Sequence, residues 1–341
     1  MNKKILNIIT YVLFTGLGVG LFWYLYRDQN MDLLISGLKK VDYYWIIISV
    51  FVYILSHFIR AIRWRILVKP LGYSPSLANS FFSVMSTYLA NYALPRLGEV
   101  TRPTIIKKYE NIPFPQTFGT IVTERIIDMA ILLILTLVVI LSQFPLISQF
   151  LQENPETYDK IVLITKLLVI LMVALIAGII IFWKFFRKKL KTNFFYKKLS
   201  DLAKKFFEGL KTIFKLEQNT LFVVYSILIW GLYFIGLYVS FLAFDFTKDI
   251  NLNCTLTVFV IGSFGMVAPS QGGLGTWHIM TSKALVIVGI AGATLSIQNQ
   301  NAEFFALVHH GAQTLMVLLV GSISIILLPI VNRKNKKNVK A

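Results

Sequence analysis

The sequence predicts an all-α polytopic membrane protein with six full transmembrane helices and two re-entrant, broken helical hairpins, arranged as an inverted repeat. Composition favours this class, because 56% of the 341 residues are hydrophobic and 15% are charged, whereas soluble domains are about 25% charged. Several apolar runs reach the ~18 residues that mark a membrane-spanning helix. The positive charges gather in a few connecting segments, as in the cytoplasmic loops of membrane proteins.

Six apolar segments are long enough to cross a ~30 Å hydrocarbon core as helices. They cover residues 5–26, 42–62, 117–142, 161–183, 221–244 and 303–330. The first is too long for the core of a signal peptide, so we interpret it as a retained helix. Because no polar stretch is long enough for a soluble unit, we expect the whole chain, 1–341, to form a single membrane domain.

Two further apolar regions, 77–107 and 254–291, are interrupted near their middle by proline and glycine. The first breaks at Pro95 within NYALPRLGEVTRP, and the second breaks at Pro269 within PSQGGLGTWH. Proline ends a helical arm because it lacks an amide donor, and glycine permits positive φ and close backbone approach. Non-helical backbone is unfavourable in lipid, so both breaks are expected to face protein or water. A packing turn between two tight spans is the alternative interpretation.

The distribution of lysine and arginine predicts how the chain crosses the membrane. With Lys3 and Lys4 inside, both termini are cytoplasmic, and the basic cluster at the end of 42–62 marks a cytoplasmic connection. That connection holds Arg60, Arg63, Arg65 and Lys69. Region 77–107 then enters and returns from the inner face, whereas region 254–291 enters and returns from the outer face.

The two halves of the chain, residues 1–145 and 160–331, share one order of elements: helix, helix, hairpin, helix. Each half has an odd number of full crossings, so the halves have opposite orientations, which is typical of secondary transporters. Residues 184–217 form a basic amphipathic cytoplasmic segment that we expect on the anionic inner leaflet, and residues 331–341 form a basic tail.

The first break carries charges at a regular spacing. Arg96, Glu99 and Arg102 recur every three residues, so they share one face if the second arm is helical. Two arginines at a hairpin tip could bind a phosphate, because guanidinium groups match phosphate oxygens in a bidentate geometry. The alternative is that these residues stay at the cytoplasmic interface as orientation signals.

Charges also occur inside the span predicted for 117–142. Glu124 and Asp128 are one helical turn apart, and Arg125 is three residues before Asp128. A charge near the centre of a bilayer is costly, so such residues normally face a cavity or pair with a partner. We therefore count them as candidate substrate-binding residues, with a structural ion pair as the alternative.

The second break carries residues suited to binding an anion. Backbone N–H groups at the start of the helix predicted for 276–291 can bind an anion, and glycine lets the backbone approach closely. The candidate residues are Gln271, Gly272, Gly273, Gly275 and His278. His309, His310 and Gln313 of the last helix could polarise the same half of a cavity, with interface histidines as the alternative. No carboxylate–histidine spacing supports a metal site, and we expect no cofactor.

No catalytic motif occurs in the sequence: there is no G-x-S-x-G, no phosphate-binding glycine–lysine loop, no D-x-D pair and no H-E-x-x-H. We therefore expect the chain not to be an enzyme. The net charge of +18 could indicate nucleic-acid binding, but the basic residues lie in segments that flank membrane spans, so no nucleic acid is expected. The single cysteine, Cys254, excludes an internal disulfide and a cysteine-based metal cluster.

Four motifs follow one another along nearly the whole chain: Arg63-Trp64, then N-x-x-x-P-R-x-G-E-x-x-R at 91–102, E-R-x-x-D at 124–128 and P-x-x-G-G-x-G at 269–275. Together they resemble the lysylphosphatidylglycerol synthase transmembrane-region family, also called the flippase-like or UPF0104 family. In such proteins the membrane region resembles a lipid flippase fused to a soluble aminoacyl-transferase domain. Only a short basic tail follows Pro329 here, so the resemblance implies lipid movement without lysyl transfer.

These observations predict an integral membrane lipid translocase, with an anionic or amphiphilic headgroup moving through a polar cavity between the two hairpins. The expected partners are membrane lipids with anionic headgroups, and a separate lipid-modifying enzyme is a candidate partner. We expect a multi-pass location in the cell inner (plasma) membrane. The alternatives are a membrane-embedded transferase acting on a lipid or polyprenyl-linked substrate, and a non-transporting membrane scaffold.

Overall fold

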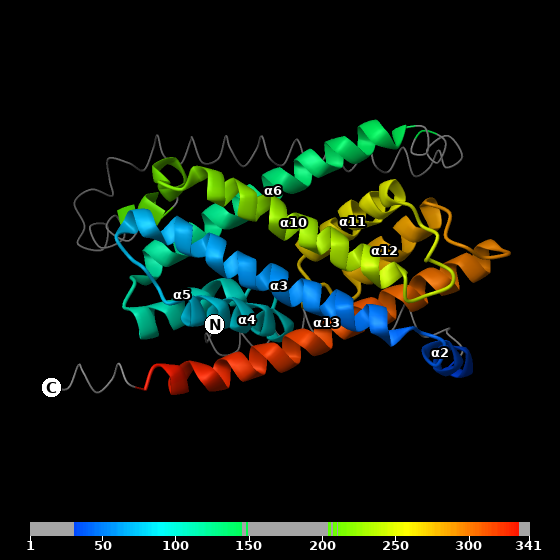
Figure 1. Cartoon of the computed structure of the whole chain (residues 1–341), viewed down its shortest axis with the longest axis horizontal. Coiled ribbons are helices and arrows are strands. Elements are labelled where there is room, and N and C mark those ends of the chain that lie inside the picture. Colours follow the sequence, from blue (N-terminus) through cyan, green and yellow to red (C-terminus); the bar gives the residue numbers. More distant parts are fainter. Residues whose placement is uncertain (1–30, 145–147, 149–203, 206, 210, 334–341) are drawn as a thin grey trace, which may run out of the picture.

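The computed structural model describes residues 31–144, 148, 204–205, 207–209 and 211–333 (Figure 1). Within these residues every regular element is a helix. The predicted spans 5–26 and 161–183 lie outside the described residues, as do most of the basic amphipathic segment and most of the basic tail.

The described helices follow the predicted order of spans and hairpins. Their bounds are α2 (Met31–Leu38), α3 (Tyr43–Val68), η1 (Lys69–Leu71), α4 (Leu77–Ala93), α5 (Gly98–Glu110), α6 (Phe114–Ser142), η2 (Lys211–Lys215), α10 (Asn219–Phe241), α11 (Leu252–Val267), α12 (Thr276–Ile287) and α13 (Leu295–Val331). Side-chain caps mark several starts: Asp42, Ser76, Asn251 and Thr294 each accept a backbone N–H of the helix that follows.

Four helices in the described part of the chain are long and apolar enough to cross a membrane. They are Tyr43–Leu71 (α3 with η1), Phe114–Ser142, Asn219–Phe241 and Leu295–Val331. These helices confirm a multi-pass membrane protein whose described part is all-helical. The total of six full spans, the inverted repeat and the cytoplasmic location of both termini stay predictions.

The end of α3 corrects the expected position of two arginines. We expected the helix to stop near residue 62 and placed Arg60 and Arg63 in a cytoplasmic connection, but α3 continues to Val68 and both side chains are buried. The helix continues because no proline or glycine interrupts it before Pro70 and Gly72. Their charges are tolerated because carboxylates of α6 neutralise them.

The region predicted to break at Pro95 forms two antiparallel arms, α4 and α5, joined by residues 94–97. At the open end, Glu110 accepts hydrogen bonds from the Ser76 N–H and hydroxyl at 2.9 and 2.8 Å. Near the tip, a methyl group on Gly98 would lie 2.2 Å from the carbonyl oxygen of Thr87, so only glycine fits. Arg96 lies in the break, before the first residue of α5, and has a φ of 63°. Contrary to the prediction, it therefore does not share a helical face with Glu99 and Arg102.

The region predicted to break at Pro269 has the same construction. Its arms, α11 and α12, are joined by residues 268–275. A methyl group on Gly265 would lie 2.9 Å from the Thr276 carbonyl oxygen, so the arms again meet at a glycine next to the tip. Both regions are therefore helical hairpins, and their re-entrance into the bilayer stays a prediction.

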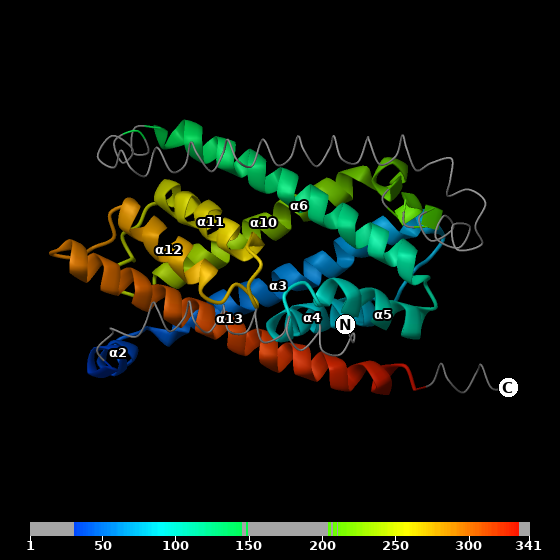
Figure 2. The same ribbon diagram turned by 180° about the vertical axis from the view of Figure 1, so that it is seen from behind.

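The two hairpin tips contact each other, and α13 packs along both hairpins (Figure 2). The amide of Gln271 donates to the carbonyl oxygen of Ala93 at 3.1 Å. A methyl group on Gly272 would lie 2.5 Å from the ring of Tyr92. Because the tips belong to opposite halves of the chain, this contact sits where the halves meet.

Candidate functional site

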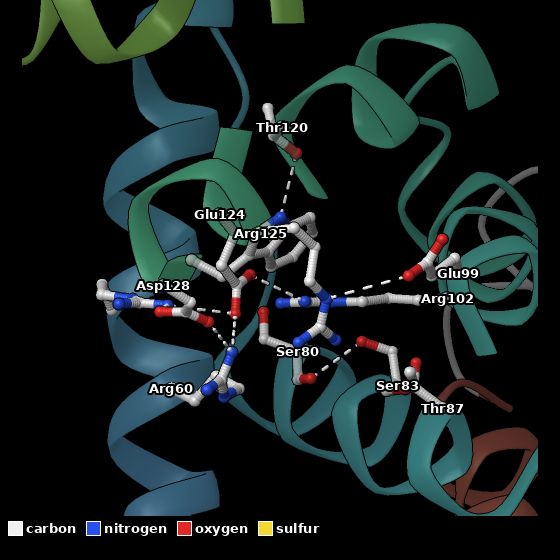
Figure 3. A network of polar contacts seen from close by, with 12 residues as sticks. Arg60, Ser80, Ser83, Thr87, Glu99, Arg102, Thr120, Glu124, Arg125 and Asp128 are labelled. Atoms are coloured by element: carbon white, nitrogen blue, oxygen red, sulfur yellow. Dashed lines mark hydrogen bonds and ion pairs between the residues drawn. The ribbon is translucent and has the colours of Figure 1, made fainter. Parts of the chain in front are cut away.

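The buried charge cluster lies where α3, α5 and α6 meet (Figure 3). We define it as Arg60, Arg63, Arg102, Glu124 and Asp128, each of which is 8% exposed or less. The first two residues are three apart on α3 and the two acids are four apart on α6, so each pair projects from one helical face. The cluster thus forms where two charged faces and one side chain of the first hairpin converge.

The arginines of α3 bind both carboxylates of α6. Arg60 Nη1 lies 2.6 Å from Glu124 Oε1 and 2.7 Å from Asp128 Oδ2. Arg63 Nη2 lies 2.9 Å from Asp128 Oδ1 and 3.3 Å from Glu124 Oε1. Because each acid serves two cations, neither carboxylate is left as an isolated buried charge.

Arg102 of α5 joins the cluster from the hairpin side. Its Nη1 donates to Glu124 Oε2 at 3.0 Å, and its guanidinium lies 4.4 Å from the centre of the Trp64 ring. The indole N–H of Trp64 donates to the hydroxyl of Thr120 at 3.0 Å, which holds the ring in place. One residue of the first hairpin is thereby tied to both α3 and α6.

The cluster carries surplus positive charge and unused donors. Three guanidinium groups face two carboxylates, which leaves a formal charge of +1. Among the described residues, Arg102 Nε and Nη2 and the Nε atoms of Arg60 and Arg63 have no hydrogen-bond partner. Buried charged donors normally find partners, so this arrangement has the chemistry of an anion site.

A more accessible edge lies beside the cluster. Arg125 Nε is 4.0 Å from Glu99 Oε1, and these side chains are 39% and 32% exposed. Figure 3 shows Ser80, Ser83 and Thr87 of α4 facing the guanidinium groups of Arg102 and Arg125. These three residues of α4 are buried, so the accessible edge of the cluster is formed by Arg125 and Glu99.

The second hairpin tip forms its own group of contacts. Gly272, Gly273 and Gly275 have φ values of 58°, 87° and 78°, a region that glycine enters without strain. The Gly275 N–H donates to His278 Nδ1 at 3.3 Å, so one of the predicted anion donors has a partner within the protein. Gln271 contacts the first tip at Ala93.

The predicted site residues therefore fall into three places. Arg102, Glu124 and Asp128 meet in the buried charge cluster, with Glu99 and Arg125 at its edge. Arg96 is exposed in the first break. The candidates of the second break lie at its tip, with α13 and the first hairpin around them.

Arg60 and Arg63 belong to the cluster and were missing from the predicted site. Their signal was present in the sequence, since three arginines fall within RAIRWR directly after an apolar run. We interpreted these arginines as an orientation signal because arginine is common at cytoplasmic helix ends. Within the described ranges, no group of three or more His, Cys, Asp and Glu side chains is placed to hold a metal ion.

The spanning helices, the two hairpins with their touching tips and the buried charge cluster together define a polytopic helical membrane protein with broken helices at its centre. The chain belongs to the family described as the lysylphosphatidylglycerol synthase transmembrane region, whose family model matches residues 7–321.

Two curated relatives share shorter stretches. The chain is 34% identical over 114 residues to a UPF0104 membrane protein of Methanocaldococcus jannaschii, covering 33% of this chain and 34% of the relative. It is 28% identical over 124 residues to the glycosyltransferase AglD of Haloferax volcanii, covering 36% of this chain and 19% of the relative. The chain thus matches about a third or less of the length of either relative. No solved structure matches it significantly.

Proposed function

We propose that the protein is a lipid translocase that moves a lipid with an anionic, phosphate-containing headgroup between the two hairpins. The observation that carries this proposal is the buried charge cluster, with its surplus positive charge and unused donors. The headgroup phosphate binds at Arg102, while the acyl chains remain in the bilayer.

The energetics of the cluster support a ligand more than a purely structural role. An unsatisfied buried donor costs about 1–3 kcal/mol, and more when it is charged. A network that served folding alone would balance its charges and satisfy its donors. Arg102 instead keeps two buried nitrogen atoms, Nε and Nη2, without a hydrogen-bond partner, while its Nη1 donates to Glu124. A phosphate oxygen supplies the missing acceptor and neutralises the surplus charge.

The hairpins supply the moving parts. Each tip is non-helical: φ is positive at Arg96 in the first tip and at three glycines in the second. The amide of Gln271 joins the tips by donating to the carbonyl oxygen of Ala93. Broken helices near the midplane of two inverted halves allow alternating exposure of a central site. Separation of the tips would open a path past Arg125 and the hydroxyl-bearing face of α4.

Membership of the family supports a lipid-related role in a membrane. We propose that this role is the movement of an intact lipid. We place the protein in the cell inner membrane, with membrane lipids and a separate lipid-modifying enzyme as partners. A membrane-embedded transferase is the second candidate, because one relative is named a glycosyltransferase. Of the buried acids in the cluster, Glu124 binds three arginines and Asp128 binds two, which makes both poor nucleophiles or bases.

The decisive experiment measures headgroup-selective translocation in proteoliposomes. Fluorescent phosphatidylglycerol, phosphatidylethanolamine and phosphatidylcholine are compared in wild type, Arg102→Gln and the matched control Arg333→Gln, which changes an exposed arginine at the end of α13. We expect anionic lipid to move fastest. We expect Arg102→Gln to slow it about tenfold to a hundredfold, because charged hydrogen bonds contribute about 1.5–3 kcal/mol.

Two results would overturn the proposal. The first is movement of all lipids at one rate, with Arg102→Gln as fast as the control although both variants are folded. The second is a new lipid species, seen by mass spectrometry when a nucleotide-activated sugar is supplied, in the absence of translocation. That second result would establish the transferase.

A further inference from the structure

A second polar cluster lies between the second hairpin tip and α13. Its members are His278 of α12 and His309 and His310 of α13, which we call the histidine triad, and all three are 2% exposed or less. Trp277 stacks on the rings of His309 and His310 at 5.3 Å each. The rings of His278 and His310 lie 4.6 Å apart. Three of the four histidines of the chain are thus gathered at one point.

The triad holds the tip in place through hydrogen bonds. His310 Nε2 lies 3.0 Å from the Gly272 carbonyl oxygen, which can only accept, so this nitrogen carries the hydrogen. The Gly275 N–H donates to His278 Nδ1, so that nitrogen carries none. The bond to Gly275 defines a neutral ring for His278, and the bond to Gly272 places a hydrogen on His310 Nε2. Together the two bonds hold two of the glycines that shape the break.

A series of contacts through two tyrosines also joins the triad to the buried charge cluster. Tyr53 Oη lies 3.4 Å from His309 Nε2 and donates to the Tyr233 carbonyl oxygen at 3.3 Å. Arg60 Nη2 donates to Tyr233 Oη at 3.2 Å. The titratable and charged groups that face this region from the packed helices are Tyr53, His57 and Arg60 of α3, Tyr88 and Tyr92 of α4, and Tyr233 of α10.

We propose that the histidine triad is a proton-binding site that couples movement of the second hairpin tip, and with it movement of the lipid, to a proton gradient. This proposal rests on the proposed function. One proton is the charge the triad accepts, because two imidazolium rings 4.6 Å apart would repel strongly in a buried setting.

The position of each acceptor nitrogen predicts where the proton goes. His310 Nδ1 lies 3.4 Å from Thr314 Oγ1, a hydroxyl that can rotate to accept, so this nitrogen gains the proton without losing a bond. A proton bound at His278 Nδ1 instead places two donors face to face and breaks the bond from Gly275. His278 also lies in the first turn of α12, where the helix dipole disfavours a cation. Protonated His278 therefore releases the tip.

The first experiment measures the coupling of lipid movement to a proton gradient in proteoliposomes. A pH difference of one unit across the membrane should drive about a tenfold asymmetry of the anionic lipid, if one proton moves with each lipid. Collapse of the gradient with a protonophore should abolish that asymmetry. We expect His278→Gln and His310→Gln to equilibrate the lipid without responding to the gradient. His57→Gln is the matched control and should keep the response, because His57 is a buried histidine outside the triad whose ring packs at a tilt against Tyr88.

The second experiment does not depend on lipid movement. Trp277 stacks on the triad, and an imidazolium quenches indole fluorescence, so acidification should quench the part of the emission that Trp277→Phe removes. His310→Gln should abolish this quenching. A gradient-independent wild type, or a Trp277 signal that does not change with pH, would overturn the proposal. Quenching without any lipid movement would instead retain the proton site and reject the translocase.

Discussion

Glu124 is the residue on which the buried charge cluster depends most. It contacts Arg60, Arg63 and Arg102, which come from two different helices, while Glu124 itself comes from a third. Its carboxylate therefore joins the first hairpin to the spanning helices α3 and α6. Asp128 contacts Arg60 and Arg63 but not the hairpin, so it cannot replace that connection.

Replacement of Glu124 by glutamine should destabilise the protein strongly. The variant leaves three buried guanidinium groups with one carboxylate, and breaking a buried ion pair costs about 3–5 kcal/mol. Denaturant unfolding in detergent measures the loss. Glu217→Gln is the matched control, because Glu217 forms an exposed ion pair with Lys69, and such pairs contribute about 0–1 kcal/mol. Equal stability of the two variants would contradict a central role for Glu124.

The hairpins depend on glycines where their arms meet. In the first hairpin the helical arms approach so closely that Gly98 lies against the backbone of Thr87. The second hairpin repeats this at Gly265 against Thr276. Because backbone atoms cannot move aside as a flexible side chain can, the distance between the arms is set by the absence of a side chain at these positions.

Gly98→Ala should therefore force the arms of the first hairpin apart. The added methyl would lie 2.2 Å from a carbonyl oxygen, and overpacking of this kind costs about 1–3 kcal/mol. Gly231→Ala in α10 is the control, since nothing lies within 4 Å of its added methyl group and alanine favours a helix by up to about 1 kcal/mol. In thermal unfolding, the midpoint temperature of Gly98→Ala should fall below that of wild type, and the midpoint of Gly231→Ala should lie above it. A Gly98→Ala protein as stable as the control would show that the arms can separate freely.

The arrangement of the hairpins across the membrane predicts which loops face the cytoplasm. Exposed Lys108 lies near the end of α5, and exposed Asp249 lies between α10 and α11. In a Cys254→Ser background, Lys108→Cys should react with an impermeant maleimide only from the cytoplasmic side. Asp249→Cys should react only from the outside. Labelling of both positions from one side would reject the inverted arrangement of the two halves.

Local patterns along the chain were sufficient to predict that the described spans and both breaks exist, although not where α3 ends. An apolar run of about 20 residues forms a membrane-spanning helix in lipid. A proline followed by glycines interrupts such a helix. For this reason α6, α10, α13 and the breaks at Pro95 and Pro269 follow from neighbouring residues alone. Glu124 and Asp128 could be singled out in the same way, because a charge inside an apolar run is unusual.

Pairing between distant segments was decided by the tertiary structure. Arg60 and Arg63 resemble the ordinary basic end of a helix in the sequence, and their partners lie 64 and 65 residues further along the chain. The contact of Gln271 with Ala93 joins residues 178 positions apart. Helix periodicity and charge bias act over a few turns, whereas the choice of partner depends on which helices pack together and how closely their glycines let them approach.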